Sequence, residues 1–402
     1  MGDPLFSHGV DLGVVVIVLV KVLVAFGFLL VSVMVMIWFE RKALSDMQNR
    51  IGPNRAGKFG ILQSLADGVK LFLKEDLLPE RADRVVFRIA PFLSVVPAFL
   101  IFAIVPVGGV VTIAHHVVEL QVADPPIGIL FVLALSSVAV YGVMLAGWSS
   151  GSKYPLLGSV RASAQMISYE AALGLTVVTV ILESHGLSTR AIVQSQAQYF
   201  WHWNALRLWV VPFVIFFIAG TAELNRPPFD LAEGDTELAG GFHTEYSSIR
   251  FAMFYIAEYM NTITMSAVVV TLFFGGPDGP GFHVVRWLWP ILWFLGKTVV
   301  FLYIQVWIRA ALPRLRYDQL MNLGWKWLIP LSLGWLLLVA GSQISKAWGY
   351  SVFAGIIVAG LMLAQARATA RRRRARLAGP ASPAPRGPLA APTLVDGTPV
   401  GG

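Results

Sequence analysis

The chain has 402 residues, of which 56% are hydrophobic and only 13% are charged, and its formal net charge is +8. Soluble proteins carry about 25% charged residues, and a soluble fold of this length could not bury so much apolar surface. The composition therefore indicates an integral membrane protein. The chain has no cysteine, so cysteine-ligated iron–sulfur clusters and disulfide bonds are excluded.

Nine segments are predicted to cross the bilayer, because a spanning helix needs about 20 mostly apolar residues. The first begins after residues that include no Lys or Arg, and it ends at Glu40, Arg41 and Lys42. It is too long for the apolar region of a cleavable signal peptide and is therefore a membrane span. The fifth is short and carries Glu223 near its end. The predicted spans are residues 12–39, 89–114, 127–148, 162–182, 207–224, 249–274, 287–309, 327–344 and 349–365.

Basic residues predict the orientation, since cytoplasmic loops carry an excess of Lys and Arg. The first, third, fifth and seventh connections hold 18 of them, whereas the second, fourth, sixth and eighth hold 4. The odd-numbered loops are therefore predicted to be cytoplasmic, with the N-terminus outside. Eight spans would leave the arginine run at 371–374 outside, whereas nine return it to the cytoplasm, so we favour nine.

The predicted fold is an all-α, polytopic transmembrane helix bundle with an eight-helix core and an added ninth C-terminal span. Residues 1–345 form the core domain, and 346–376 supply the extra span and a basic segment. Residues 377–402 are rich in Pro and Gly without periodicity, so we expect a disordered tail.

Two loops that we assign to the cytoplasm are more than simple connections. Loop 225–248 opens with Pro227 and Pro228, which cannot continue a helix. In the first loop, apolar residues recur at helical spacing and polar residues fall on the other side, which predicts an amphipathic helix at the membrane surface. The apolar positions are Ile61, Leu62, Leu65, Ala66, Val69, Phe72 and Leu73, and the polar ones are Gln63, Asp67, Lys70 and Lys74.

The acidic residues are the most informative feature of the sequence. Seven of the 23 Asp and Glu lie within 223–258, and Glu170 and Glu258 fall inside predicted spans. Ionised groups in a bilayer are costly, so they usually face a polar interior and mark ion or proton paths. The alternative is that they pair with arginines or solvate a loop. Arg226 could pair locally with Glu223, but no basic residue lies one turn from the other two.

Two lysines also lie inside predicted spans. Lys21 is near the outer end of the first span, where its long side chain can reach the interface. Lys297 is near the middle of the seventh span, so we expect it to have a buried partner among the acids.

The first cytoplasmic loop combines many basic residues with the amphipathic helix. Attraction to anionic lipids would explain the charge alone. A surface helix beside a gap between spans also suggests a doorway for an amphiphile that arrives from the bilayer. The residues concerned are Arg41, Arg50, Arg55, Lys58, Asp67 and Lys70.

Other chemistry has no support in the sequence. It contains neither a G-x-G-x-x-G fingerprint nor a Walker-type lysine. His115 and His116 are adjacent, so they would point to different faces of a helix and make a poor metal pair. We therefore expect the chain to bind neither nicotinamide nor metal by itself.

Several long motifs agree, in order, with a known family. Over about residues 10–345 the chain resembles the H subunit of the NADH-quinone oxidoreductases, respiratory complex I. The segment after 345 departs from the family pattern, so the ninth span gains no support from it. The motifs that carry the resemblance are residues 40–42, 48–54, 66–75, 141–170, 222–238, 245–259 and 313–326.

The resemblance implies a membrane component that forms a quinone chamber and links it to a proton-translocating chain of acids. Asp235 stands where relatives often carry Glu, which puts its equivalence in doubt. The implied quinone-binding residues are Arg41, Arg50, Gln63, Asp67 and Lys70. The implied proton-relay residues are Glu170, Glu223, Asp230, Glu233, Asp235, Glu237, Glu245 and Glu258.

The resemblance also implies partners and a location. Quinone, either menaquinone or ubiquinone, would be a substrate, while FMN and iron–sulfur clusters would lie on partner subunits only. The implied partners are the other subunits of the membrane and peripheral arms and the membrane lipids, without nucleic acid. The implied location is the plasma membrane of a bacterium.

Two other functions remain open at this point. An ion-coupled secondary transporter can also carry acids at the middle of the membrane, and it would move ions without any partner. The equivalent component of a related membrane hydrogenase or oxidoreductase would differ in the electron donor, whose site lies on other chains. The neighbouring genes would show which electron-donor subunit the complex has, and would therefore distinguish this possibility from an NADH-quinone oxidoreductase.

Overall fold

The structure is a computed structural model of the chain, which describes residues 5, 11–113, 116–197, 199–230, 240–280, 287–345, 348, 351 and 355. The predicted ninth span, 349–365, falls almost entirely outside these residues, and so does the predicted tail. Three predicted relay acids, Glu233, Asp235 and Glu237, also lie outside them. The division of the chain at 345 and at 376 therefore stays a prediction.

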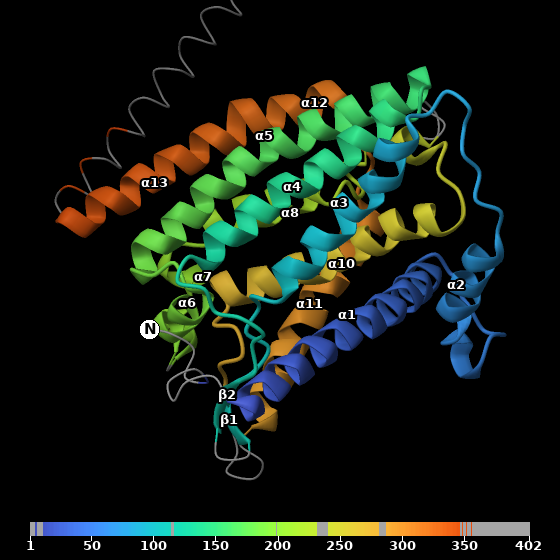
Figure 1. Cartoon of the computed structure of the whole chain (residues 1–402). Helices are drawn as coiled ribbons and strands as arrows, with labels where there is room; N and C mark the ends of the chain where they lie inside the picture. Colours follow the sequence, from blue (N-terminus) through green and yellow to red (C-terminus); the bar gives the residue numbers. More distant parts are fainter. Residues whose placement is uncertain are drawn as a thin grey trace, which may run out of the picture.

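Within the described residues, seven helices are long and apolar enough to cross a membrane. A shorter apolar helix, α8 (Val211–Glu223), stands where the fifth span was predicted. These helices confirm the predicted all-α polytopic bundle (Figure 1). The seven long ones are α1 (Leu12–Met47), α3 (Arg84–Phe102), α4 (Gly128–Ser149), α5 (Lys153–Ser184), α10 (Ser248–Phe273), α11 (Leu288–Ala311) and the continuous helix Tyr317–Ile344.

The last of these long helices changes its winding along its length. It starts as α12 (Tyr317–Leu323), passes through the π-helical turn η5 (Gly324–Leu328) and ends as α13 (Ile329–Ile344). The remaining helices are short and lie in the connections. They are η2 (Lys58–Gly60), α2 (Gln63–Leu73), α6 (Thr189–Gln196), η3 (Phe200–His202), α7 (Asn204–Arg207) and η4 (Gly241–His243).

The second predicted span, 89–114, is wrong at both ends. Its helix, α3, starts earlier because Asp83 caps it by accepting hydrogen bonds from the backbone of Val85 and Val86. The helix ends at Phe102, ahead of a Pro and two Gly, and the β-branched run that follows forms a strand. This strand, β1 (Val110–Ile113), pairs antiparallel with β2 (His116–Glu119).

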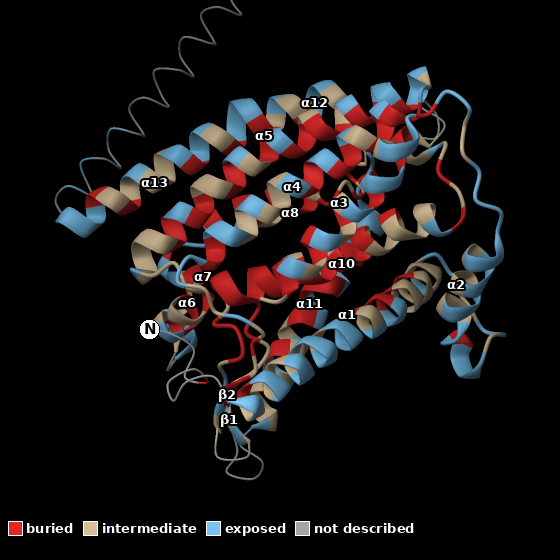
Figure 2. Ribbon diagram, in the orientation of Figure 1, coloured by how far each residue is buried: buried red, intermediate tan, exposed pale blue. Residues whose placement is uncertain are grey.

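Helix α10 lies at the centre of the bundle, where it packs against α3, α11 and α1. Most of its length is buried, whereas little of α1 is buried, as the colours along the two helices show (Figure 2). Glycines let α3, α4 and α5 approach closely. A Cβ atom added at Gly142 would collide with Ser94 Oγ of α3, and one added at Gly147 would collide with Ser159 Oγ of α5.

The connections gather at two ends of the bundle (Figure 1). Helix α2 lies at one end, and the β1–β2 hairpin, α6 and α7 lie at the other. The predicted amphipathic helix in the first loop is confirmed as α2. The alternation of connections agrees with the prediction that odd and even loops lie on different sides. Which of the two sides faces the cytoplasm stays a prediction.

Candidate functional site

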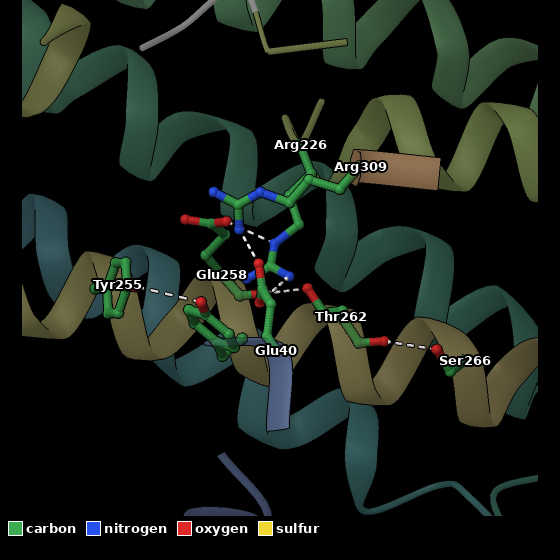
Figure 3. A network of polar contacts seen from close by, with 8 residues as sticks. Glu40, Arg226, Tyr255, Glu258, Thr262, Ser266 and Arg309 are labelled. Carbon is green, nitrogen blue, oxygen red and sulfur yellow. Dashed lines mark hydrogen bonds and ion pairs between the residues drawn. The ribbon is translucent and has the colours of Figure 1, made fainter. Parts of the chain in front are cut away.

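Four charged side chains from distant parts of the sequence form a cluster around the buried Glu40 and Arg226 (Figure 3). Arg226 Nε lies 2.7 Å from Glu258 Oε1, and Arg226 Nη1 lies 3.1 Å from Glu40 Oε2. Arg309 binds the other oxygen of Glu40. The Glu40 side chain is only 2% exposed and that of Arg226 only 7%. We call these four residues the ion-pair cluster; it is electrically neutral when all four are ionised.

The sequence after α8 explains why Arg226 turns inward. Asn225 adopts a positive φ of 53° and the helix stops there. Gln165 of α5 then donates hydrogen bonds of 2.7 Å to the carbonyls of Ala222 and Phe229, on either side of Arg226. Both ends of the turn are thus fastened to α5, which holds the guanidinium against α1, α10 and α11.

The electrostatic surroundings keep the Arg226 guanidinium charged. Burial alone would lower its pKa, but the Glu258 carboxylate and Tyr259 outweigh burial and raise the pKa above its ordinary value. The guanidinium carbon also lies 4.1 Å from the centroid of the Tyr259 ring, a cation–π contact. Arg226 is therefore a fixed positive charge within the cluster.

Glu223, the last residue of α8, lines two adjoining cavities. Both cavities have Met166, Leu224 and Asn261 in their walls. The second also contains Glu258 of the ion-pair cluster, and we call it the acid cavity. One acid of the cluster and one acid outside it therefore face the same interior space.

Glu170 and Glu223 form a second pair of neighbouring acids inside the bundle. Glu170 of α5 accepts a hydrogen bond from Ser137 of α4. Glu223 is bonded by the neighbouring Ser136, and it lies close enough to Glu170 for the two carboxylates to repel each other. The acids therefore form a series from Glu258 of the ion-pair cluster through Glu223 to Glu170.

A large groove lies between α1, α2 and α10. Apolar side chains make up most of its wall. We call it the α1–α2 groove. Its polar wall contains Ser64 and the charged residues Arg41, Asp67 and Lys70. Phe251 and Tyr255 of α10 line both this groove and the acid cavity, so they form the partition between the two.

Hydrogen bonds fix the polar wall of the groove. Asp67 Oδ2 lies 2.5 Å from Arg41 Nη1, and Asp67 Oδ1 accepts a bond of 3.2 Å from Gln63 Nε2. Lys70 Nζ is 3.9 Å from the same carboxylate and its side chain is 71% exposed. Asp67 thus holds the Arg41 guanidinium in place, while Lys70 is free to move.

The structure brings together some of the residues predicted from the sequence and separates others. Arg41, Asp67 and Lys70 line the groove, and Gln63 supports it, but Arg50 is exposed in the turn after α1 and does not line it. Among the described acids, Asp230 and Glu245 are half-buried and line none of these cavities.

Two expectations about pairing are corrected. Glu258 does have an arginine partner, Arg226, although no basic residue lies one turn away in its own helix. Arg226, which could have paired locally with Glu223, binds Glu258 and Glu40 instead. Lys297 donates to three backbone carbonyls, at 2.7–3.1 Å, rather than to an acid of the predicted relay.

Four residues of the site were missed in the sequence. Glu40 and Arg309 looked like ordinary charges at the ends of spans. Tyr255 and Tyr259 belong to a polar stripe along α10 that also contains Glu258, Thr262 and Ser266 at helical spacing. That stripe was a signal that could have found both tyrosines.

The fold and the site together define a class of protein: a multi-pass membrane protein whose helices enclose a charged cluster beside a large groove. A sequence profile of the NADH dehydrogenase family matches residues 20–340. A Frankia alni protein, named as the H subunit of NADH-quinone oxidoreductase, is 49% identical over 357 residues, which cover 86% of this chain and 78% of the relative. The chain therefore belongs to the NADH dehydrogenase family, as the motifs predicted.

Family membership places the chain among the membrane subunits of a respiratory enzyme complex. The described helices agree with that class, since seven of them can cross a membrane. In the described part of the chain, no group of three or more His, Asp or Glu is arranged to hold a metal ion.

Proposed function

We propose that the chain is the H subunit of a proton-translocating NADH-quinone oxidoreductase, in which the α1–α2 groove admits quinone from the bilayer. One observation carries the proposal. The groove and the acid cavity share Phe251 and Tyr255 as their common wall. A quinone in the groove would therefore lie one side chain away from the acids.

The groove suits the two parts of a quinone molecule. Side chains such as Met34, Ile37 and Leu65 offer an apolar surface for the isoprenoid tail. Arg41, held by Asp67 at 2.5 Å, offers a fixed donor for a carbonyl oxygen of the head group. Ligand sites generally combine a largely apolar lining with a few placed polar groups.

Coupling to protons would be electrostatic. Reduction of a quinone to a quinol takes up two electrons, supplied by a partner protein of the complex, and two protons. The gain and loss of charge in the groove would be felt by Glu258 and then by Glu223 and Glu170, because charge interactions are strong in a poorly solvated interior. The acids would respond to this change of charge by gaining or losing protons as a coupled set.

The proposed membrane location and orientation follow from the charges of the loops and from the similarity to the Frankia alni protein. The chain would cross the plasma membrane of a bacterium with its N-terminus outside and α2 on the cytoplasmic side, where the basic loops lie. Its partners would be the other subunits of the complex and the surrounding lipids. The apolar wall of the groove suits the isoprenoid tail of either menaquinone or ubiquinone.

Photo-crosslinking tests the proposed site. The intact complex would be labelled with an azido-quinone, with and without excess unlabelled quinone, and the labelled peptides mapped. We expect competed labels within residues 41–75 or 225–259. Competed labels confined to other subunits would contradict the proposal.

The transporter alternative makes a different prediction. Purified chain in liposomes would move ions without any partner if the acids served a secondary transporter. The 49% identity to a component of an oxidoreductase disfavours this alternative. A hydrogenase-type complex differs only in the electron donor, and the genes beside this one would decide it.

A further inference from the structure

Two tyrosines of α10 lie between the groove and the ion-pair cluster. The hydroxyl oxygens of Tyr255 and Tyr259 are 3.2 Å apart, so one donates a hydrogen bond to the other. Tyr255 lines the groove and the acid cavity. Tyr259 is only 2% exposed, and its ring lies against the Arg226 guanidinium. The pair thus touches the groove at one end and the cluster at the other.

An arginine stands at each end of the pair. Arg41 lines the groove together with Tyr255, and the Arg226 guanidinium carbon lies 4.1 Å from the centroid of the Tyr259 ring. The hydroxyl pair therefore lies between Arg41, which is bound to Asp67, and Arg226, which is bound to Glu258 and Glu40.

The two hydroxyl protons of Tyr255 and Tyr259 have two possible arrangements. Each phenol has one proton, and only one of the two protons is used between the tyrosines. If Tyr259 donates to Tyr255, the Tyr255 proton is free to point into the groove. If Tyr255 donates to Tyr259, the Tyr259 proton is the one that is not used within the pair.

We propose that the Tyr255–Tyr259 hydroxyl pair reports the state of the quinone in the groove to the ion-pair cluster. This inference rests on the proposed function. A quinone carbonyl only accepts hydrogen bonds, so it favours the Tyr255 proton pointing into the groove. A quinol hydroxyl can donate to Tyr255, which then turns its own proton toward Tyr259. The reversal changes the field at Glu258, and only O–H directions change, so no covalent bond breaks.

The two residues have different roles in this proposal. Tyr255 touches the head group and helps to bind it. Tyr259 is a positioning residue that acts through Arg226 and Glu258. Removing the Tyr255 hydroxyl should weaken binding and also break the pair, whereas removing the Tyr259 hydroxyl should leave binding intact; both changes should slow the coupled reaction.

The experiment compares Tyr255→Phe, Tyr259→Phe and a matched control in the intact complex. Tyr246→Phe is the control, because Tyr246 is also buried but its hydroxyl lies 3.2 Å from the backbone carbonyl of Phe87 rather than in the pair. Assembly is checked by NADH oxidation with ferricyanide. Turnover is measured with decylubiquinone, and proton pumping is measured in vesicles with a fluorescent pH dye.

The proposal predicts a split between KM and kcat. Tyr255→Phe should raise the KM for decylubiquinone by about 2- to 10-fold, the effect of one hydrogen bond, and it should also lower kcat because it breaks the pair. Tyr259→Phe should keep KM within about two-fold and lower kcat and pumping by about ten-fold, as for a bond to a charged network. Because the two hydroxyls act as one pair, the double variant should have a kcat no lower than Tyr259→Phe alone.

Two results would overturn the inference. One is a Tyr259→Phe variant that behaves like Tyr246→Phe in kcat and pumping. The other is independent, multiplicative loss in the double variant. If azido-quinone labels residues 41–75 while either result is found, the inference alone fails. If the competed labels lie only on other subunits, the proposed function fails as well.

Discussion

Glu40 and Arg226 form an ion pair across 186 residues of sequence, with Nη1 of the arginine 3.1 Å from Oε2 of the glutamate. Neither side chain has more than a few per cent of its surface exposed. Taking two charges out of water is costly, and the cost is recovered only where each charge has good partners. Glu40 has two such partners, since Arg309 binds its other oxygen. The charge balance of the ion-pair cluster therefore depends on Glu40.

The first prediction concerns Glu40→Gln. The change leaves two arginines facing one remaining carboxylate, and breaking a buried pair in this way costs about 3–5 kcal/mol. We expect less assembled complex in the membrane and a lower melting temperature of the purified complex. Both can be measured by native gel densitometry and by thermal inactivation of quinone reductase activity.

Two further variants make this prediction specific to charge balance. Asp76→Asn breaks the more exposed pair of Asp76 and Arg250, in which the aspartate side chain is 37% exposed, and it should cost less than about 1 kcal/mol. Adding Arg309→Gln to Glu40→Gln restores neutrality and should recover part of the lost stability. A double variant no more stable than Glu40→Gln would speak against the balance argument.

The second prediction concerns Glu170→Gln and Glu223→Gln. Neither acid is a member of the ion-pair cluster, and each has a serine partner that an amide can also engage. We expect assembly and ferricyanide activity to stay normal, while quinone-coupled pumping falls by at least about ten-fold, as for loss of a proton-transferring group. Pumping would be followed in vesicles alongside quinone reduction. Full coupled activity in both variants would remove these acids from the proposed relay.

The sequence was sufficient for the helices but not for the cluster. The length of an apolar run is set by the thickness of the bilayer, so α1, α10 and α11 could be placed within a few residues, apart from the C-terminal extension of α1. Local sequence also explains the hairpin that replaced the end of the second span, although it was missed. The contacts of Glu40, by contrast, join residues 186 and 269 positions apart, and no local pattern carries that information.

The third prediction concerns orientation, and the absence of cysteine makes it simple to test. Trp201→Cys places a thiol at the end of the bundle that holds α6 and α7, where Trp201 is 62% exposed. Lys58→Cys places one in the exposed loop before α2. A membrane-impermeant maleimide added to spheroplasts should label the first, and should label the second only after lysis. The opposite order would reverse the predicted topology.

The fourth prediction concerns the width of the α1–α2 groove. Gly68 lies on α2 in the wall of the groove, and a Cβ atom added there would meet nothing within 4 Å. Gly68→Leu should therefore fold without strain and project into the space proposed for quinone. We expect the KM for decylubiquinone to rise by roughly ten-fold, which corresponds to about 1.4 kcal/mol of lost binding, while assembly is unchanged.

Gly27→Leu is the matched control for this variant. Gly27 lies on an exposed part of α1, and a Cβ atom added there also meets nothing within 4 Å, but it does not line the groove. Both substitutions replace a helical glycine with a good helix former, so both should stabilise the helix by a similar amount, up to about 1 kcal/mol. A difference between them in KM then reports the groove rather than the helix. Equal KM values in the two variants would mean that quinone does not pass between α1 and α2.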